Sequence, residues 1–288
     1  MPSTSTLKIV KPVESPGQPG SLNDPYFYFQ DVFKSFDAQK VLEGVSFRVF
    51  PGETVCVLGR SGVGKSVCLR LIMGFLKPDA GRIFVAGHDI TSYTEDQLQQ
   101  VHKKVTMVFQ DGALFDSLTV AENVAFPLVE KGFDEQQVEA RVDELLDLVG
   151  MKQVRNYLPA GISTGMKRAV AIARAVASDA EAILFDEPTT MVDPLMARRL
   201  GRLINRLKTE MKLTSVVVTH DMRLVERVAD RVVFLEGGHV VLYGLPTEME
   251  HSPEPVVRQF VELDRIDLNT ALQILSGGSK RTQGRKTA

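Results

Sequence analysis

Long apolar runs and cysteine are both scarce in this sequence. No window approaches the roughly 18 consecutive apolar residues that a membrane-spanning helix requires, and residues 1–20 include no apolar core of signal-peptide length. Only two of the 288 residues are cysteines, Cys56 and Cys68, and their separation is not a ligand spacing. We therefore predict a chain that neither crosses a membrane nor is secreted, with both thiols buried in a reducing cytoplasm.

A strong excess of either charge is also absent. The 34 Lys and Arg residues against 36 Asp and Glu residues give a net charge of -2. Proteins that bind nucleic acid usually carry a strongly basic domain or stripe, so no nucleic-acid partner is expected. The composition, 44% hydrophobic and 24% charged, excludes a collagen-like, coiled-coil or wholly disordered chain and leaves room for one large or two small folded domains.

The chain divides into a central domain and two terminal segments. Residues 1–25 are rich in Ser, Pro and Gly and poor in large apolar side chains, so we predict a disordered N-terminal tail. Residues 251–288 form a C-terminal extension, and its end carries four basic residues without an acid, namely Lys280, Arg281, Arg285 and Lys286. We interpret this end as a solvated tail, with attraction to an anionic lipid surface as the alternative.

Residues 26–250 show the pattern of an α/β domain. Short apolar runs alternate with segments of helical period, and such runs suit strands that are covered on both faces of a largely parallel sheet. The predicted strands are Val55–Leu58, Val105–Phe109, Ile183–Phe185, Ser215–Thr219 and Arg231–Leu235. The alternation stops at about residues 111–177, where an amphipathic helix begins at Asp134 with Gln137 in a capping box, and a second begins at Met166. We predict that this segment is an inserted helical subdomain.

The string GRSGVGKS is the strongest functional motif. It follows the predicted strand that ends at Leu58 and opens a helix, which is the context that a phosphate-binding loop requires. Its glycines let backbone N–H groups converge on phosphate oxygens, while Lys65 would reach the β- and γ-phosphates and Ser66 would join a Mg²⁺ shell. A glycine-rich structural turn is the alternative. The predicted nucleotide-binding residues here are Gly59, Arg60, Ser61, Gly62, Val63, Gly64, Lys65, Ser66 and Val67.

Polar residues that follow other predicted strands extend this site. Asp186 and Glu187 end the string ILFDE; Asp186 suits Mg²⁺, which prefers oxygen ligands, and Glu187 suits a base that orients and deprotonates an attacking water. Gln110 and His220 end two further strands. Because the carboxyl ends of strands line the ligand crevice of such a sheet, we predict that both face the γ-phosphate with Lys65. Each could instead be a turn residue with its polar tip in water.

With these motifs in this order, the chain resembles the nucleotide-binding subunits of ABC transporters over about residues 26–250. The resemblance implies an ABC-type P-loop NTPase with a RecA-like core, an antiparallel β subdomain and the inserted α-helical subdomain. It implies an ATPase that uses ATP and Mg²⁺, works as a homodimer and drives integral membrane permease subunits. It also places the protein peripherally on the cytoplasmic face of the inner membrane.

The resemblance adds residues to the predicted site. Phe36 would stack on adenine, Gln110 would sense Mg²⁺ and the membrane partner, and Ile162–Met166 would be the signature loop of the family. Two subunits would meet head to tail, so that the signature of one closes over the γ-phosphate held by the other; Ser163 suits this role as a helix N-cap. The catalytic residues are then Glu187, His220, Lys65 and Gln110. The cofactor contacts outside the phosphate loop are Phe36, Gln110, Asp186, Ser163, Gly165 and Asp193, and the metal ligands are Ser66, Gln110 and Asp186.

A narrower resemblance concerns cargo. Phe109–Leu128, Met166 and Ser252–Phe260 are similar to the ATPases of bacterial MCE-type lipid transport systems. This implies phospholipid cargo and an MCE-domain lipid-binding subunit. It also implies that exposed Leu114, Phe115 and Phe126 form part of a groove for a permease helix; the alternative for these three side chains is ordinary core packing.

The alternatives for the whole chain are an importer ATPase for a small polar solute such as an amino acid, a soluble P-loop kinase, or an ABC protein that binds ATP without turnover.

Two positions depart from the family pattern. Thr164 stands where the signature loop has its first Gly, and Met191 with Val192 replaces the glycine-containing turn before Asp193. A side chain in a loop that approaches phosphate closely could reduce contact or turnover. Since Ser163 and Gly165 remain, we expect an active but slow ATPase.

Overall fold

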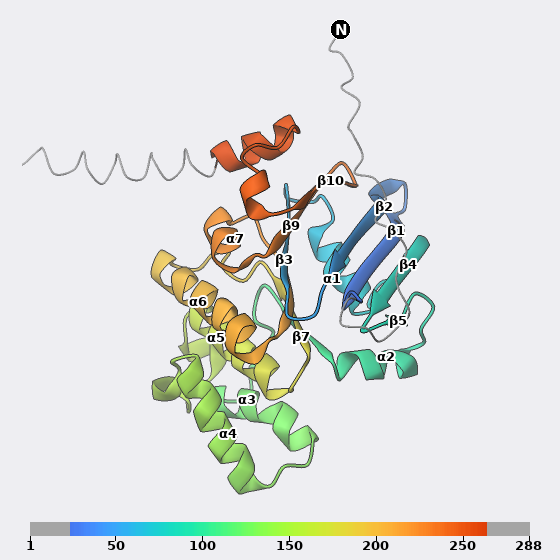
Figure 1. Cartoon of the computed structure of the whole chain (residues 1–288). Helices are drawn as coiled ribbons and strands as arrows, with labels where there is room; N and C mark the ends of the chain where they lie inside the picture. Colours follow the sequence, from blue (N-terminus) through green and yellow to red (C-terminus); the bar gives the residue numbers. More distant parts are fainter. Residues whose placement is uncertain (1–23, 264–288) are drawn as a thin grey trace, which may run out of the picture.

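The computed structural model describes residues 24–263, which form two β-sheets with helices packed around them (Figure 1). The predicted tail over residues 1–25 lies outside this range except for Asp24 and Pro25, and the predicted basic C-terminal end lies outside it entirely. Among the described residues, no helix is both long enough and apolar enough to cross a membrane.

The larger sheet has six strands in the order β10-β9-β3-β8-β7-β6, and all neighbours are parallel except β9 and β10. The strands are β3 (Thr54–Gly59), β6 (Val105–Val108), β7 (Ala182–Asp186), β8 (Thr214–Val218), β9 (Arg231–Glu236) and β10 (His239–Gly244). Every residue of β3, β7 and β8 is buried, as expected for continuous apolar runs covered on both faces. The predicted α/β architecture is confirmed. Two predicted strands end one residue early, at Val108 and Val218.

The smaller sheet is antiparallel, in the order β2-β1-β4-β5. Its strands are β1 (Phe27–Phe36), β2 (Gln39–Val49), β4 (Ala80–Val85) and β5 (His88–Asp89). The resemblance implied this sheet, but residue periodicity did not predict its strands. The pairing of β1 with β2 shifts register between Phe29 and Val32 and twice more further along, which breaks the two-residue alternation that identifies a strand.

The central strands divide the core in two. Side chains alternate in direction along a strand, so Cys56 and Leu58 of β3 face one apolar cluster while Val55 and Val57 face the other. The first cluster lies under the helices that follow β6, and the second lies between the two sheets around α1 (Lys65–Ile72). Both cysteines are free and buried, as predicted.

The remaining helices cover the six-stranded sheet and extend beyond it. They are α2 (Glu95–His102), α3 (Val120–Glu130), α4 (Glu135–Leu148), α5 (Thr164–Ala177), α6 (Pro194–Met211) and α7 (Met222–Val228). The Asp134 carboxylate accepts from the Gln137 N–H at 2.8 Å, which confirms the predicted capping box of α4. α5 begins two residues before the predicted Met166, and no pattern predicted α2. In Figure 1, α3 and α4 (green) lie at the opposite end of the molecule from the helical residues 255–263 (red).

Candidate functional site: a phosphate-binding cavity

The phosphate loop joins β3 to α1 as a strongly curved segment. Gly59 and Gly64 have φ of 142° and 106°, values that side chains with a Cβ rarely adopt. An added Cβ would lie 2.4 Å from the Leu235 carbonyl oxygen at Gly59 and 2.8 Å from Val41 Cγ1 at Gly64. Both positions therefore require glycine for conformation and for space.

Lys65 holds this loop from within. Its Nζ donates to the carbonyl oxygens of Gly59 at 2.9 Å and Arg60 at 3.0 Å, and the residue is buried. Burial lowers the pKa of Lys65, and the charges of Glu187 and Asp186 oppose that effect. An ammonium group in this position lies where phosphate oxygens would meet the loop N–H groups.

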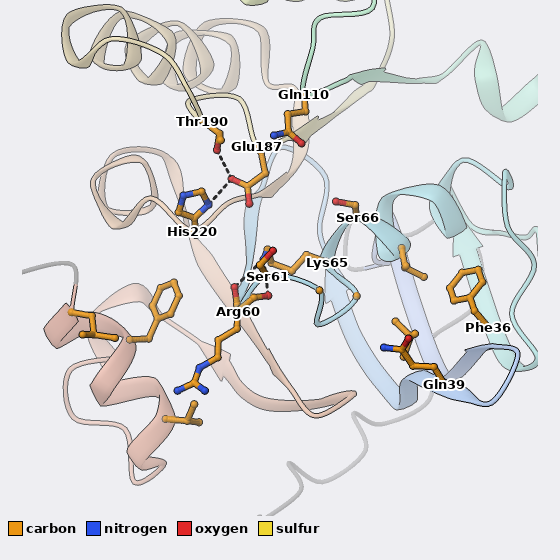
Figure 2. A pocket seen from close by; sticks show the side chains of 18 residues that line it. Phe36, Gln39, Arg60, Ser61, Lys65, Ser66, Gln110, Glu187, Thr190 and His220 are labelled. Atoms are coloured by element: carbon orange, nitrogen blue, oxygen red, sulfur yellow. Dashed lines mark hydrogen bonds and ion pairs between the residues drawn. The ribbon is translucent and has the colours of Figure 1, made fainter. Parts of the chain in front are cut away.

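The loop forms the floor of a cavity of about 930 Å³ (Figure 2). Predicted residues from four other parts of the chain also line it: Phe36 at the end of β1, Gln110 after β6, Glu187 after β7 and His220 after β8. The lining residues are Phe36, Gln39, Val41, Gly59, Arg60, Ser61, Gly62, Gly64, Lys65, Ser66, Val67, Gln110, Glu187, Thr190, His220, Val256, Phe260 and Leu263. A pocket of this size suits a nucleotide, with the half-exposed Phe36 ring available for a base.

Ser66 and Asp186 form a pair of oxygen ligands beside the loop. The Ser66 hydroxyl donates to Asp186 Oδ1 at 2.8 Å. Burial raises the pKa of Asp186, whereas the Ser66 bond and the Arg70 and Lys65 charges lower it, with a net increase. A hydroxyl and a carboxylate oxygen fit Mg²⁺, which is usually held by one or two protein oxygens together with phosphate oxygens. Gln110, the third residue of the predicted metal-binding set, lines the cavity with Ser66, whereas Asp186 does not.

Glu187 lies across the cavity from Lys65 and is held by two neighbours (Figure 2). Its Oε2 lies 2.9 Å from His220 Nδ1 and accepts from the Thr190 hydroxyl at 2.9 Å. Burial raises the pKa of Glu187, but the bonds and charges of His220, Thr190 and Lys65 outweigh it, so the net pKa is lowered. The bond to Glu187 raises the pKa of His220 despite partial burial. The two groups therefore favour an ionised carboxylate beside an imidazolium.

The backbone of Glu187 is fixed by a residue that the sequence analysis missed. Arg168, almost fully buried in α5, donates from Nη1 to the Glu187 carbonyl at 2.7 Å and from Nη2 to the Thr190 carbonyl at 3.1 Å. The Glu187 N–H donates to the Val218 carbonyl at 2.9 Å, and its φ is 47°. The sequence signal that could have identified Arg168 is a charged residue on the apolar face of a predicted helix. Thr190, Gln39 and Val41 were missed as well.

The other predicted residues lie elsewhere. Ser163 and Asp193 are the N-caps of α5 and α6; Ser163 Oγ accepts from the Met166 N–H at 3.3 Å and Asp193 Oδ1 from the Met196 N–H at 2.9 Å. Neither they nor Gly165 line the cavity, and Val63 and Asp186 are also outside the lining. Thus one chain brings together the phosphate loop, Phe36, Gln110, Glu187 and His220, but not the signature loop.

The structure also shows where the two residues that depart from the family pattern lie, and where the side chains of the predicted permease groove lie. Thr164 is the first residue of α5, and Met191 is 88% exposed with φ of 58°. Phe115 and Phe126 are exposed and their ring centroids are 4.7 Å apart. Leu114 is partly buried against the core, so the expectation that it is exposed was wrong.

A nucleotide-binding P-loop protein is the class that this fold and cavity define. The sequence profile of the family described as ABC transporter matches residues 42–190. Methionine import ATP-binding protein MetN of Brucella abortus (strain 2308) is 36% identical over 242 residues, which are 84% of this chain and 66% of that protein. MetN 2 of Rhodococcus jostii (strain RHA1) is 39% identical over 242 residues, 82% of this chain and 71% of that protein. This chain spans just under two thirds of the Brucella relative.

Solved structures give the same result. The dimeric post-hydrolysis state of the ATP-binding cassette MJ0796, bound to ADP and Pi, aligns with a TM-score of 0.71 at 30% identity over 76% of this chain and 98% of that one. CbiO1 from Clostridium perfringens, part of the ABC transporter complex cbiONQ, aligns with a TM-score of 0.74 at 28% identity. The alignment covers 86% of this chain and 100% of that one.

The chain therefore belongs to the ABC transporter family, and its fold is that of an ABC-type P-loop ATPase. The predicted fold class is confirmed. The narrower resemblance is not supported, because the similar curated proteins named above are methionine importers and not MCE-type lipid ATPases. They favour the alternative of an importer for a small polar solute.

Proposed function

We propose that this chain is the ATP-hydrolysing subunit of an ABC transporter and that two copies hold two ATP·Mg²⁺ between them. One observation carries the proposal: a single cavity has Lys65 and the phosphate loop on one wall, and the Glu187 carboxylate, bound by His220 and Thr190, on another. A phosphate-binding wall that faces a positioned, ionised base is the arrangement required for attack of water on a γ-phosphate.

The residues divide the work of hydrolysis. Phe36 stacks on the adenine, and Lys65 and the loop N–H groups bind the phosphates. Glu187 orients a water whose oxygen bonds to the γ-phosphorus while the bond from that phosphorus to the bridging oxygen of ADP breaks. The proton of the water passes to the Glu187 carboxylate, and His220 beside it stabilises the charge on the phosphoryl oxygens. Ser66, Asp186 and Gln110 would hold a Mg²⁺ ion, which would supply positive charge to offset the negative charge of the phosphates.

A second copy completes each site in this proposal. Ser163 and Gly165 lie outside the cavity of their own chain, at the N-terminus of α5, where backbone N–H groups and the helix dipole favour an anion. Head-to-tail pairing would bring them to the γ-phosphate of the other copy, with Asp193 in the same contact. This geometry supports the homodimer that the family resemblance implied.

A membrane partner is expected at the Phe115 and Phe126 pair. These two rings are 42% and 38% exposed; Phe115 lies between Gln110 and α3, and Phe126 lies on α3. Adjacent exposed aromatic rings are typical of interface anchors. We expect a segment of an integral membrane permease to bind here, which would place the protein peripherally on the cytoplasmic face of the membrane.

For the cargo, the comparisons favour a small polar solute such as methionine, since the relatives named above are methionine import ATP-binding proteins. A second candidate, phospholipid transport with an MCE-domain subunit, rests on the segment Phe109–Leu128 with its aromatic pair. The proposed ATP-binding and catalytic residues contact ATP and not the cargo. Sequence identity at these residues is therefore weak evidence for which cargo is carried.

Two measurements test these proposals. The purified chain should release phosphate from ATP·Mg²⁺, and Lys65→Ala should abolish this by removing nucleotide binding; transfer of phosphate to another acceptor with none to water would instead indicate a kinase. Complexes taken from membranes in mild detergent and reconstituted into vesicles should then take up radiolabelled methionine. Recovery of an MCE-domain subunit with bound phospholipid, and no uptake of methionine, would replace the solute importer with the lipid transporter.

A further inference from the structure

A second groove adjoins the catalytic cavity between α6 and α7. It has a volume of about 340 Å³, and two of its lining residues, Thr190 and His220, also line the nucleotide cavity. Both of these residues bind the Glu187 carboxylate at 2.9 Å. The groove therefore begins at the residues that position the proposed base.

Three arginines line this groove: Arg198 of α6, and Arg223 and Arg227 of α7. Among residues 24–263, none of their guanidinium groups has an ion pair or a side-chain hydrogen bond. Arg227 lies across α6 at Gly201, where an added Cβ would be 2.9 Å from Arg227 Cδ. The absence of a side chain at Gly201 thus provides the space in which Arg227 packs.

The one acidic residue in the groove does not neutralise these arginines. Asp221 Oδ1 accepts from the N–H groups of Arg223 and Leu224 at 3.0 and 3.3 Å, and Oδ2 accepts from the Thr189 hydroxyl at 2.9 Å. Both carboxylate oxygens are occupied by local bonds. Three guanidinium groups around a concave site attract and bind a small multiply charged anion, because each presents a fork of donors that matches phosphate oxygens.

We propose that this groove binds the inorganic phosphate released by hydrolysis and forms its exit from the catalytic cavity. The inference rests on the proposed function, since hydrolysis supplies the phosphate. The anion passes from beside Glu187, past His220 and Thr190, to the arginines. Binding there lowers the chance that phosphate returns to ADP, and it makes free phosphate a product inhibitor that acts outside the nucleotide cavity.

Equilibrium dialysis with radiolabelled orthophosphate tests the site directly. The full chain is saturated with ADP and beryllium fluoride, which occupy the nucleotide cavity, and further phosphate binding is then measured. We expect one additional site per chain, weakened at least about tenfold in the double variant Arg223→Gln/Arg227→Gln, since two charge-assisted bonds are lost. Arg202→Gln, an exposed arginine of the same helix α6 that does not line the groove, is the matched control and should bind as the parent does.

Three outcomes would overturn the proposal: no additional phosphate binds, binding is lost equally in Arg202→Gln, or only vesicles that contain phosphatidic acid bind. A kinetic measurement separates this inference from the function itself. In single turnover, the double variant should cleave ATP at the parental rate but release phosphate more slowly, as followed with a fluorescent phosphate sensor. Normal cleavage with unchanged release refutes the exit route alone, whereas absence of cleavage in the parent refutes the ATPase proposal.

Discussion

Glu187 shows how one residue can be held in place for a reaction. Its φ of 47° is unfavourable for a residue with a Cβ, and hydrogen bonds at both ends of its backbone maintain it, from its N–H to Val218 and from Arg168 to its carbonyl. His220 and Thr190 then fix the carboxylate. Such a locally unfavourable conformation, supported by surrounding bonds, is typical of catalytic positions.

At this scale we predict that Glu187→Gln lowers the turnover of ATP by about 10²- to 10⁴-fold, because an amide cannot accept the proton of the attacking water. Binding of ATP should remain, since the phosphate loop is unchanged. Steady-state phosphate release and nucleotide binding by fluorescence would measure the two effects. Glu226→Gln, a change of an exposed carboxylate on α7, is the control. Parental turnover in Glu187→Gln would show that another group is the base.

The Glu187 and His220 pair also predicts a pH dependence. The pKa of His220 is raised above its value in the unfolded chain, so its share of stability is complete below the unfolded pKa and is lost as pH rises through the folded pKa. The pKa of Glu187 is lowered, so its share is present above the unfolded pKa and is lost as pH falls through the folded pKa. The pair therefore stabilises the fold most at pH values above the unfolded pKa of Glu187 and below the unfolded pKa of His220.

NMR titration of the His220 ring checks this directly. In the parent, the midpoint should lie above the usual range of histidine, and Glu187→Gln should move it down, because the hydrogen bond to a carboxylate and the attraction to its charge are lost. Glu226→Gln should not move it. A midpoint that is the same in the parent and Glu187→Gln would mean that the two groups do not interact in solution.

Among the elements, α5 connects two parts of the proposed mechanism. Its N-terminus carries Ser163, which is expected to contact the phosphate of the second copy, and five residues later Arg168 binds the loop that holds Glu187. α5 also packs in the apolar core through residues such as Val170 and Ile172, so it moves as a unit. A change at the signature end of this helix can thus reach the base through a single side chain.

We predict that Arg168→Met lowers both stability and turnover. The carbonyls of Glu187 and Thr190 lose buried donors, at a cost of about 1–3 kcal/mol in the free energy of unfolding. Turnover should fall with little change in the affinity for ATP, since Arg168 does not line the cavity. Urea unfolding and steady-state kinetics would measure these effects.

Arg174→Met is the matched control for this prediction. Arg174 lies on the same helix and donates to the carbonyls of Gly112 and Ala113, away from the base. It should lose stability while keeping most of its turnover. Equal losses of turnover in both variants would show that Arg168 acts only through general stability.

At the scale of the whole molecule, each chain holds only part of the proposed site. The cavity has its phosphate loop and base, but Ser163 and Gly165 lie on another surface of the same chain. Pairing of two copies by a two-fold axis would produce two complete sites at once, because each chain supplies both halves.

A mixing experiment tests this arrangement. Lys65→Ala copies cannot bind ATP, and Ser163→Arg copies cannot close over the phosphate of a partner, so each variant alone should be inactive. A mixed dimer contains one site with Lys65 from one chain and Ser163 from the other, and mixing should restore part of the activity. If the mixture is as inactive as the separate variants, the site is not shared between copies. Light scattering in the presence of ATP should show dimers in the mixture.

The local motifs explain why so much of the site was accessible from the sequence. The string Gly59–Ser66, Glu187 after a buried strand, and the N-cap Ser163 are each defined by a few neighbouring residues, and the structure places each as an N-cap, turn or strand end. The bulged strand β1 and the helix α2 were missed, because bulges and short helices lack a sustained period. Arg168 was missed because its partners lie 19 and 22 residues away.

The sequence by itself determined the phosphate loop, the parallel sheet and the charged residues at the ends of its strands, since these depend on local conformation and on burial of continuous apolar runs. Only the tertiary structure decided which of those residues meet. The crossovers of the sheet bring Lys65, Glu187 and His220 to one cavity and keep Ser163 out of it. They also place Arg198, Arg223 and Arg227, which have no ion pair within residues 24–263, in the groove that His220 lines. Such contacts join segments far apart in the chain, and the packing of the whole core sets them.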